Sequence, residues 1–240
     1  MNYGLKVPKT QAPSKSLYTL YYPHTTPILK RRWVQKYDQF ISIDPAIKNL
    51  AIRVERRHHD GYIQCLYSNK FCPYDVQVMD NMEVNKIYEN INTLLQPLQT
   101  YFVTTHYVLI ERQLPENYQA TRVAQHLLSY FILQMKDKYN LASIIEVDPK
   151  LKGKLLGAQR CNKNELKAWA VVKATELATQ RGDQYTLDLF KQHKKKDDLA
   201  DVLCQIEAFC HLTNLSITRH ITKTTTTTDT CVINVIHIKK

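Results

Sequence analysis

The stretch FISIDPAIKNLAIRV, residues 40–54, decides the fold of this 240-residue chain. Residues 40–44 form a short apolar run that ends in the acid Asp44, and residues 50–54 have the alternating pattern of a strand with one buried face. Two such runs joined by a short loop are typical of a β-hairpin. We therefore predict two antiparallel strands here, with Asp44 at the end of the first.

Further strand and helix patterns follow this hairpin along the chain. A third strand is predicted over residues 62–71, and two buried strands over residues 107–111 and 143–148. Apolar residues at helical spacing predict helices over residues 83–100 and 118–139. This order predicts an α/β fold with a mixed five-stranded sheet, in which three antiparallel strands are followed by parallel ones, flanked by helices on both faces.

The last third of this core is basic and helical. Residues 150–163 contain lysines and an arginine with no acid among them, and we predict a loop there. Asn162 and Glu165 form a capping-box pattern, which predicts a helix that starts near residue 163. The final helix is predicted over residues 197–212, and its first turn carries aspartates, which favour a helix N-terminus.

The two ends of the chain differ from this core. Residues 1–36 hold four of the nine prolines and keep no strand or helix period, so we predict an N-terminal extension. Residues 213–240 include a run of threonines at residues 224–228 and are predicted to form a threonine-rich C-terminal tail. A single domain is therefore expected over residues 37–212.

The net charge narrows the classes of function. Lysine and arginine number 33 against 22 aspartates and glutamates, which gives a formal charge of +11 at pH 7. A basic surface attracts polyanions because each neutralised phosphate releases counterions, so nucleic acid is the favoured partner. Binding to an anionic membrane and a charge that serves solubility alone remain alternatives.

Other features of the composition predict an intracellular protein without a membrane span. Apolar residues make up 44% of the chain, yet no run of about 18 of them occurs. The N-terminal segment contains no apolar stretch of the kind found in secretory signals. The six cysteines follow no CxxC spacing, which predicts free thiols rather than a zinc site.

Four carboxylates are spaced so that folding can bring them together. Asp44 and Glu111 each end a predicted strand, and Asp198 and Asp201 lie three residues apart on the last helix. Residues at that helical spacing share one face, with Cβ atoms about 5–6 Å apart. If the first and fourth strands are neighbours and the helix packs across their ends, the acids converge. Such a cluster repels itself unless a cation neutralises it, and Mg²⁺ prefers carboxylate oxygens.

Each of these acids also has a simple structural interpretation. Asp44 can form a turn before a proline, and Glu111 can pair with a neighbouring cation. The aspartates of the last helix can cap that helix or face solvent. The joint occurrence of all of them on the predicted elements favours a shared site.

Three segments resemble the signature motifs of RuvC-type Holliday junction resolvases, most closely the poxvirus-type enzymes of large DNA viruses. The segments are IDPAIKN at Ile43–Asn49, LIERQ at Leu109–Gln113 and KKDDLAD at Lys195–Asp201. Ala46 stands where the family usually has glycine, whereas Asn49 keeps its place. The resemblance covers residues 37–212.

This resemblance implies an RNase H-like fold and a magnesium-dependent endonuclease that acts as a homodimer. By the same resemblance, two Mg²⁺ ions, for which Mn²⁺ can substitute, would be bound by Asp44, Glu111, Asp198 and Asp201, with Asp197 left out. The implied partners are four-way junctions and other branched DNA, cut by paired symmetric nicks. The implied role is viral genome recombination and concatemer processing inside the host cell, in the cytoplasm, a viral factory or the nucleus.

The basic residues near these motifs gain a role in DNA binding under this interpretation. They are Lys150, Lys152, Lys154, Arg160, Lys163, Lys167, Lys194, Lys195 and Lys196. For each lysine, a solvated basic face is the alternative.

Two rival functions stay open. Other nucleases share this fold, so the chain could be an RNase H or a mitochondrial-type resolvase, and cleavage of RNA would need readout of the 2′-hydroxyl. A non-catalytic DNA-binding module on the same fold is expected to lack one of the acids, and all four are present.

Overall fold

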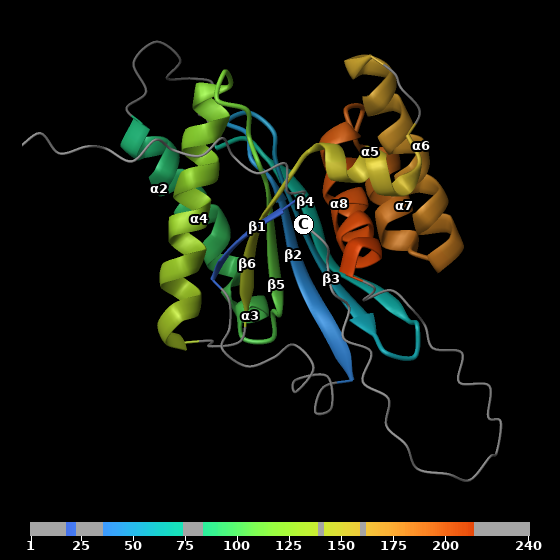
Figure 1. Ribbon diagram of the computed structural model, residues 1–240, viewed down its shortest axis with the longest axis horizontal. Helices are drawn as coiled ribbons and strands as arrows, with labels where there is room; N and C mark the ends of the chain where they lie inside the picture. Colours follow the sequence, from blue (N-terminus) through green and yellow to red (C-terminus); the bar gives the residue numbers. More distant parts are fainter. Residues whose placement is uncertain (1–17, 23–35, 74–83, 139–141, 159–161, 214–240) are drawn as a thin grey trace, which may run out of the picture.

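The structure is a computed structural model that describes residues 18–22, 36–73, 84–138, 142–158 and 162–213. Its strands are β1 (Tyr18–Tyr22), β2 (Tyr37–Asp44), β3 (Leu50–His58), β4 (Ile63–Phe71), β5 (Tyr107–Glu111) and β6 (Ser143–Val147). Its helices are α2 (Val84–Leu95), α3 (Gln99–Phe102), α4 (Tyr118–Lys138), α5 (Lys150–Leu156), α6 (Lys163–Arg181), α7 (Gln184–Gln192) and α8 (Asp197–Thr213), and the 3-10 turn η2 (Gln96–Leu98) joins α2 to α3. The sheet lies between two helical layers, α2–α4 on one side and α5–α8 on the other (Figure 1).

The sheet is mixed, as the sequence predicts. β2, β3 and β4 form an antiparallel meander, while β5 runs parallel to β2 and β6 runs parallel to β5. The predicted α/β sheet of three antiparallel strands followed by parallel ones is therefore confirmed. A further strand, β1, pairs antiparallel with β6 and gives the order β1-β6-β5-β2-β3-β4. β1 comes from the residues that the sequence predicts to be an extension.

Alternation along the central strands directs side chains into two hydrophobic cores. Ile43 of β2 belongs to the core that contains Phe131 of α4. Leu109 of β5 belongs to the core that contains Phe209 of α8. Glu111 lies two residues beyond Leu109 on the same strand, so it faces the α8 side of the sheet.

Local sequence signals set both ends of α6. The Asn162 side chain accepts hydrogen bonds from the backbone N–H groups of Asn164 and Glu165, and the Glu165 side chain accepts one from the Asn162 N–H, which confirms the predicted capping box. Gly182 follows the last turn with a φ of 64°, a left-handed conformation that glycine adopts without a Cβ clash.

Asn162→Ala is expected to lower the free energy of unfolding by about 1 kcal/mol, because two N–H groups at the start of α6 lose their acceptor. Urea denaturation followed by circular dichroism measures the change. Asn162→Asp keeps a side-chain oxygen that accepts these hydrogen bonds and should stay within a few tenths of a kcal/mol of the parent protein. Equal stability of Asn162→Ala and the parent would show that the cap contributes nothing.

The prediction of a loop over residues 150–163 is wrong for residues 150–156, which form α5. Leu151 of this helix is buried in the core that also contains Leu109 and Phe209. A helix this short has little stability of its own, so packing rather than a local signal determines it.

The described residues bear on the expectations for membrane spans and for cysteines. Within these ranges, no helix combines the length and the apolarity needed to cross a bilayer. Within the described residues, Cys65, Cys72, Cys204 and Cys210 form no disulfide.

A buried ion network joins β3 to the α6–α8 layer. Glu55 accepts from Arg53 Nε at 2.8 Å and lies 2.7 Å from Arg57 Nη2, and both the Arg53 and Glu55 side chains are fully buried. Arg57 Nη2 also lies 2.8 Å from Glu207 Oε2 on α8, and Arg181 of α6 pairs with the same carboxylate. The network fixes α8 against β3, and α8 carries two of the predicted acids.

Burial raises the pKa of Glu55, but the positive charges of Arg57, Arg53 and Arg181 outweigh this effect and lower that pKa to about 2. The carboxylate is therefore ionised in the folded protein at neutral pH, and its charge is compensated inside the network.

Candidate active site

The two acids at strand ends lie side by side at one edge of the sheet. β2 and β5 are parallel neighbours in which Ile43 pairs with Ile110, so the residues that follow, Asp44 and Glu111, are neighbours as well. The carboxyl ends of parallel strands meet at the same edge of a sheet, where α/β proteins place functional side chains. The first and fourth predicted strands are thus adjacent, as the convergence of the acids requires.

The last helix brings the other two acids to this edge. The negative charges of Asp201 and Asp198 both act on the pKa of Asp44, and Asp201 shares a lysine with Glu111. The four carboxylates that the sequence analysis selected are therefore gathered at one place.

Lys152 of α5 lies between two of these acids. Its Nζ is 2.6 Å from Glu111 Oε2 and 2.8 Å from Asp201 Oδ1, and its side chain is only 9% exposed. Burial lowers the pKa of Lys152, but the charges of Glu111, Asp201 and Asp44 outweigh this effect and raise the pKa well above the usual lysine value. Lys152 is therefore an internal counter-charge, whereas the sequence suggested only that it contacts DNA phosphates.

The cluster holds more negative charge than this one ammonium compensates. Burial raises the pKa of Asp44 well above its ordinary value, and the charge of Glu111 raises it further, while Lys152 opposes the rise. Burial also raises the pKa of Glu111, again with Lys152 in opposition. Carboxylates with raised pKa values repel one another when ionised, so a bound cation would relieve the repulsion.

Asp198 lies between two lysines at the start of α8. Lys195 Nζ is 3.3 Å from Asp198 Oδ2, and Lys70 Nζ is 3.9 Å from the same oxygen. Burial raises the pKa of Asp198, and the charge of Asp197 raises it further. Its buried Oδ2 accepts no hydrogen bond from any residue that the structure describes. The two ammonium groups therefore compensate the charge of this oxygen without a well-aligned hydrogen bond.

The neighbouring aspartate, Asp197, has a different partner. Lys167 Nζ of α6 lies 2.5 Å from Asp197 Oδ2. Burial raises the pKa of Asp197, but the hydrogen bond from Lys167 and the charges of Lys167 and Lys195 together outweigh it and lower that pKa. Asp197 thus joins α8 to α6.

The donor set fits a hard divalent cation, although a lysine occupies part of it. Mg²⁺ is bound in proteins by carboxylate oxygens together with water. Among the residues that the structure describes, no three His, Cys, Asp or Glu side chains are grouped closely enough to hold a metal ion. Lys152 contacts Glu111 and Asp201 in this arrangement. Binding of a cation by all four acids would therefore require the Lys152 ammonium to withdraw.

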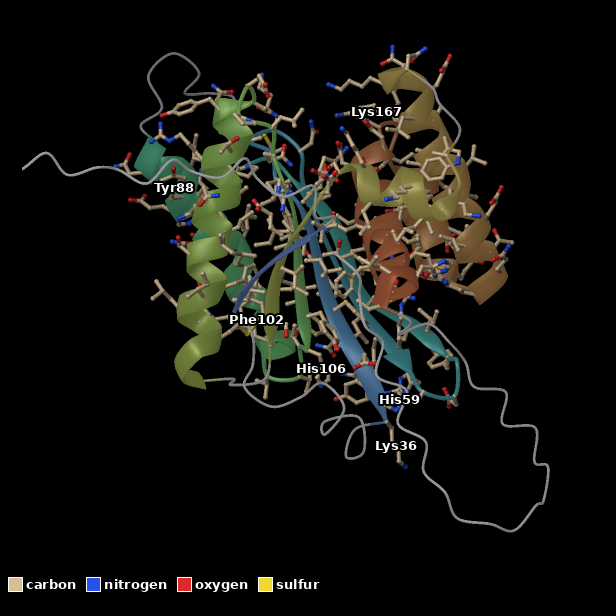
Figure 2. The ribbon with its side chains drawn as sticks, in the orientation of Figure 1. Lys36, His59, Tyr88, Phe102, His106 and Lys167 are labelled. Carbon is tan, nitrogen blue, oxygen red and sulfur yellow. The ribbon has the colours of Figure 1, made fainter. Side chains whose placement is uncertain are left out.

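The predicted DNA-binding residues differ in their surroundings. Exposed side chains are those of Lys150, Lys154, Lys163, Lys194 and Lys195, whereas Lys196 is half-buried. Arg160 lies outside the described residues. Figure 2 shows Lys167 at one end of the molecule and Lys36 at the opposite end. Because Lys36 precedes β2, the other end of that strand, with Asp44, lies on the side of Lys167.

Sequence reasoning did not single out Lys70. Lys70 comes near the acids only because β4 pairs with β3, and this pairing joins strands rather than neighbouring residues. No pattern in the residues around Lys70 indicates a site.

Comparisons with known proteins identify viral relatives. No protein-family model matches the sequence. "Uncharacterized protein 97L" of Invertebrate iridescent virus 3 is 37% identical over 102 residues, which are 42% of this chain and 46% of that protein. "Uncharacterized protein 170L" of Invertebrate iridescent virus 6 is 26% identical over 141 residues, which are 51% of this chain and 57% of that protein. The chain therefore spans about half the length of the curated relatives it matches.

Solved structures establish the fold. The yeast mitochondrial Holliday junction resolvase is similar with a TM-score of 0.53 and 16% identity, over 78% of this chain and 89% of that one. RuvC of Thermus thermophilus is similar with a TM-score of 0.50 and 14% identity, over 74% of this chain and 96% of that one. The predicted RNase H-like fold, in the form found in RuvC-type resolvases, is confirmed.

Proposed function

We propose that this protein is a structure-selective endodeoxyribonuclease that resolves four-way DNA junctions by hydrolysis of phosphodiester bonds. The observation that carries the proposal is the meeting of Asp44, Glu111, Asp198 and Asp201 at the strand-end edge of the sheet. These are the acids that the three sequence motifs select, and they lie on a fold that Holliday junction resolvases share.

We assign a role to each of these residues from its position in the site. Asp44 is central, because the charges of Glu111, Asp201 and Asp198 all act on it. We propose that it contributes to both cation positions, with Glu111 on one side and the aspartates of α8 on the other. Once withdrawn from Glu111 and Asp201, the Lys152 ammonium would stabilise the negative charge of a bound phosphate.

Magnesium is the cofactor that we propose, with Mn²⁺ as a substitute, held by Asp44, Glu111, Asp198 and Asp201. When bound, such ions lower the pKa of a water molecule and stabilise the charge of the leaving oxygen. The meeting of the acids at this edge of the sheet and the raised pKa of Asp44 support a cation at this place.

The net positive charge and the resolvase-like fold support junction DNA as the substrate. A four-way junction has two equivalent strands to cut, so paired symmetric nicks need two active sites, and we propose a homodimer. The relatives described above are proteins of invertebrate iridescent viruses. We propose a role in viral genome recombination and concatemer processing within the host cell.

A cleavage assay on three labelled substrates tests this function: a four-way junction, a linear duplex of the same sequence and an RNA–DNA hybrid, each with Mg²⁺ or with EDTA. Symmetric cuts in the junction alone, lost with EDTA, are expected. Cleavage of the hybrid alone would indicate an RNase H. Junction binding without a cut in either Mg²⁺ or Mn²⁺ would indicate a non-catalytic DNA-binding module.

Junction affinity is expected to fall steeply with salt, because exposed lysines neutralise phosphates and release counterions. Lys163→Gln should reduce the slope of log Kd against log salt concentration by about 0.9, the value for one phosphate contact. Fluorescence anisotropy in calcium-containing buffer measures it. Lys86→Gln serves as the control, because Lys86 is exposed on α2, in the other helical layer. A slope that is unchanged in Lys163→Gln would remove Lys163 from the DNA-binding surface.

A further inference from the structure

Lys70 lies on the edge strand β4, yet its side chain comes close to one of the four acids, Asp198. Asp44 pairs with Ala51 of β3, and Ala51 in turn pairs with Lys70. Directly paired residues point to the same face of a sheet, so Lys70 and Asp44 share the face that α8 covers. Neighbouring strands are about 4.8 Å apart, which separates the two backbones by about 10 Å. On this face, the Lys70 side chain contacts the start of α8.

The Lys70 ammonium is bound to the segment that leads into α8. Its Nζ donates a hydrogen bond to the backbone carbonyl of Lys195 at 2.7 Å and lies 3.9 Å from Asp198 Oδ2. The side chain is 14% exposed. A lysine that is mostly buried and already bonded to a carbonyl is better placed to hold a backbone segment than to contact a phosphate.

Lys195 connects the backbone segment that Lys70 holds to the carboxylate of Asp198. While its carbonyl accepts from Lys70, its own ammonium lies 3.3 Å from Asp198 Oδ2. With the amide of Asn49 oriented to satisfy its neighbours, the Asn49 oxygen accepts from Lys195 Nζ at 3.1 Å. The approach to α8 is therefore held from two sides, by Lys70 of β4 and by the β2–β3 loop.

We propose that Lys70 is a positioning residue of the active site: it holds the Lys195 carbonyl against the sheet and thereby fixes the direction in which Asp198 presents its carboxylate. This inference rests on the proposed function of the four acids. It gives Lys70 a role distinct from DNA binding, and it makes an edge-strand residue part of the site's geometry.

Lys70→Met tests the proposal, because methionine keeps most of the apolar stem and removes the ammonium. We expect kcat for junction cleavage to fall by about 10- to 100-fold, the scale of a misplaced catalytic group, while KM stays within about twofold. We also expect Mn²⁺ alone, titrated into the full-length protein without DNA, to bind about tenfold more weakly. Hydrogen exchange should become faster at residues 193–200 and stay unchanged elsewhere.

Two further variants complete the design. Lys70→Arg keeps a charged donor that reaches a carbonyl and should recover most of the lost kcat. Lys191→Met is the matched control, because Lys191 is a surface lysine of α7 whose side chain is 72% exposed. It should change neither kcat nor Mn²⁺ affinity.

The sign of the change in Mn²⁺ affinity separates the possible roles of Lys70. Tighter Mn²⁺ binding by Lys70→Met would mean that Lys70 is only a repelling charge, and a raised KM with a lower salt slope would make it a phosphate contact. Either result overturns the proposal, as does unchanged exchange at residues 193–200. A parent protein without metal-dependent cleavage would refute the proposed function, whereas hydrogen exchange would still decide whether Lys70 holds this segment.

Discussion

The variant Asp44→Asn is expected to lose junction cleavage by at least about 10³-fold while the folded protein becomes more stable. Asparagine has nearly the same shape as aspartate but carries no charge, so the cluster loses the carboxylate on which the other three acids act. Cleavage of a labelled junction under single-turnover conditions measures the loss of activity.

The gain in stability follows from the direction of the pKa shift of Asp44. Burial and the charges of Glu111, Asp201 and Asp198 raise this pKa above the usual 3.8, so the ionised form is disfavoured in the folded protein relative to the unfolded chain. The resulting destabilisation is absent below the ordinary aspartate pKa and grows as the pH rises toward the folded-state pKa. Asp44→Asn removes it, so its advantage in Tm should be largest at neutral pH and shrink on acidification.

Asp188→Asn is the matched control for this experiment. Asp188 lies on α7, where its carboxylate accepts from Lys191 Nζ at 2.9 Å at the surface. This variant should cleave junctions at the parental rate. Asp44→Asn that cleaves within about tenfold of the parent would exclude Asp44 from the catalytic set, and a lower Tm at neutral pH would contradict the electrostatic account of the cluster.

The variant Glu55→Gln is expected to lower the free energy of unfolding by about 3–5 kcal/mol. The Glu55 side chain is fully buried and lies between the guanidinium groups of Arg53 and Arg57. Loss of this one negative charge leaves buried arginines close together with too little compensation. Since domains are stabilised by only about 5–15 kcal/mol, this change is a large fraction of the total.

Urea denaturation followed by circular dichroism measures the effect of Glu55→Gln, with an unchanged m-value expected. Glu89→Gln is the control, because Glu89 is 61% exposed and pairs with Lys86 at the surface of α2. Exposed pairs contribute about 0–1 kcal/mol, so this control should be nearly neutral. A loss below about 1 kcal/mol in Glu55→Gln would show that water or rearranged partners compensate the network.

The pKa of Glu55 also gives the parent protein a specific acid sensitivity. The network lowers this pKa from the usual 4.5 to about 2, so its stabilisation is fully present above the ordinary glutamate value. As the pH falls from the ordinary value toward the folded-state pKa, the unfolded chain takes up the proton first and this stabilisation is lost. The loss should be smaller in Glu55→Gln, because glutamine does not titrate.

Much of the architecture follows from short-range patterns in the sequence. The apolar run of residues 40–44 and the alternation of residues 50–54 predict the hairpin, apolar spacing predicts α4, and the pair Asn162 and Glu165 predicts the start of α6. These signals are local, because a strand period, a helix period and a cap each depend on residues only a few positions apart. The acids at the ends of β2 and β5 could be selected for the same reason.

Contacts between residues far apart in the sequence determined structural features that no local pattern predicts. β1 pairs with β6 although more than a hundred residues separate them, and α5 forms where a loop was expected because Leu151 has a core to enter. The alternation of β3 gave no sign that Arg53 would be buried within an ion network that reaches α8 and Asp183, the N-cap of α7.

The candidate site also combines features that local sequence determines with features that only long-range packing creates. The sequence by itself determined which acids end the strands and which share a helix face, because those are properties of neighbouring residues. Only the tertiary structure decided that Lys152 lies between Glu111 and Asp201 and that Lys70 binds the Lys195 carbonyl. Each of these contacts joins residues from different elements, so each exists only after the helices have packed on the sheet.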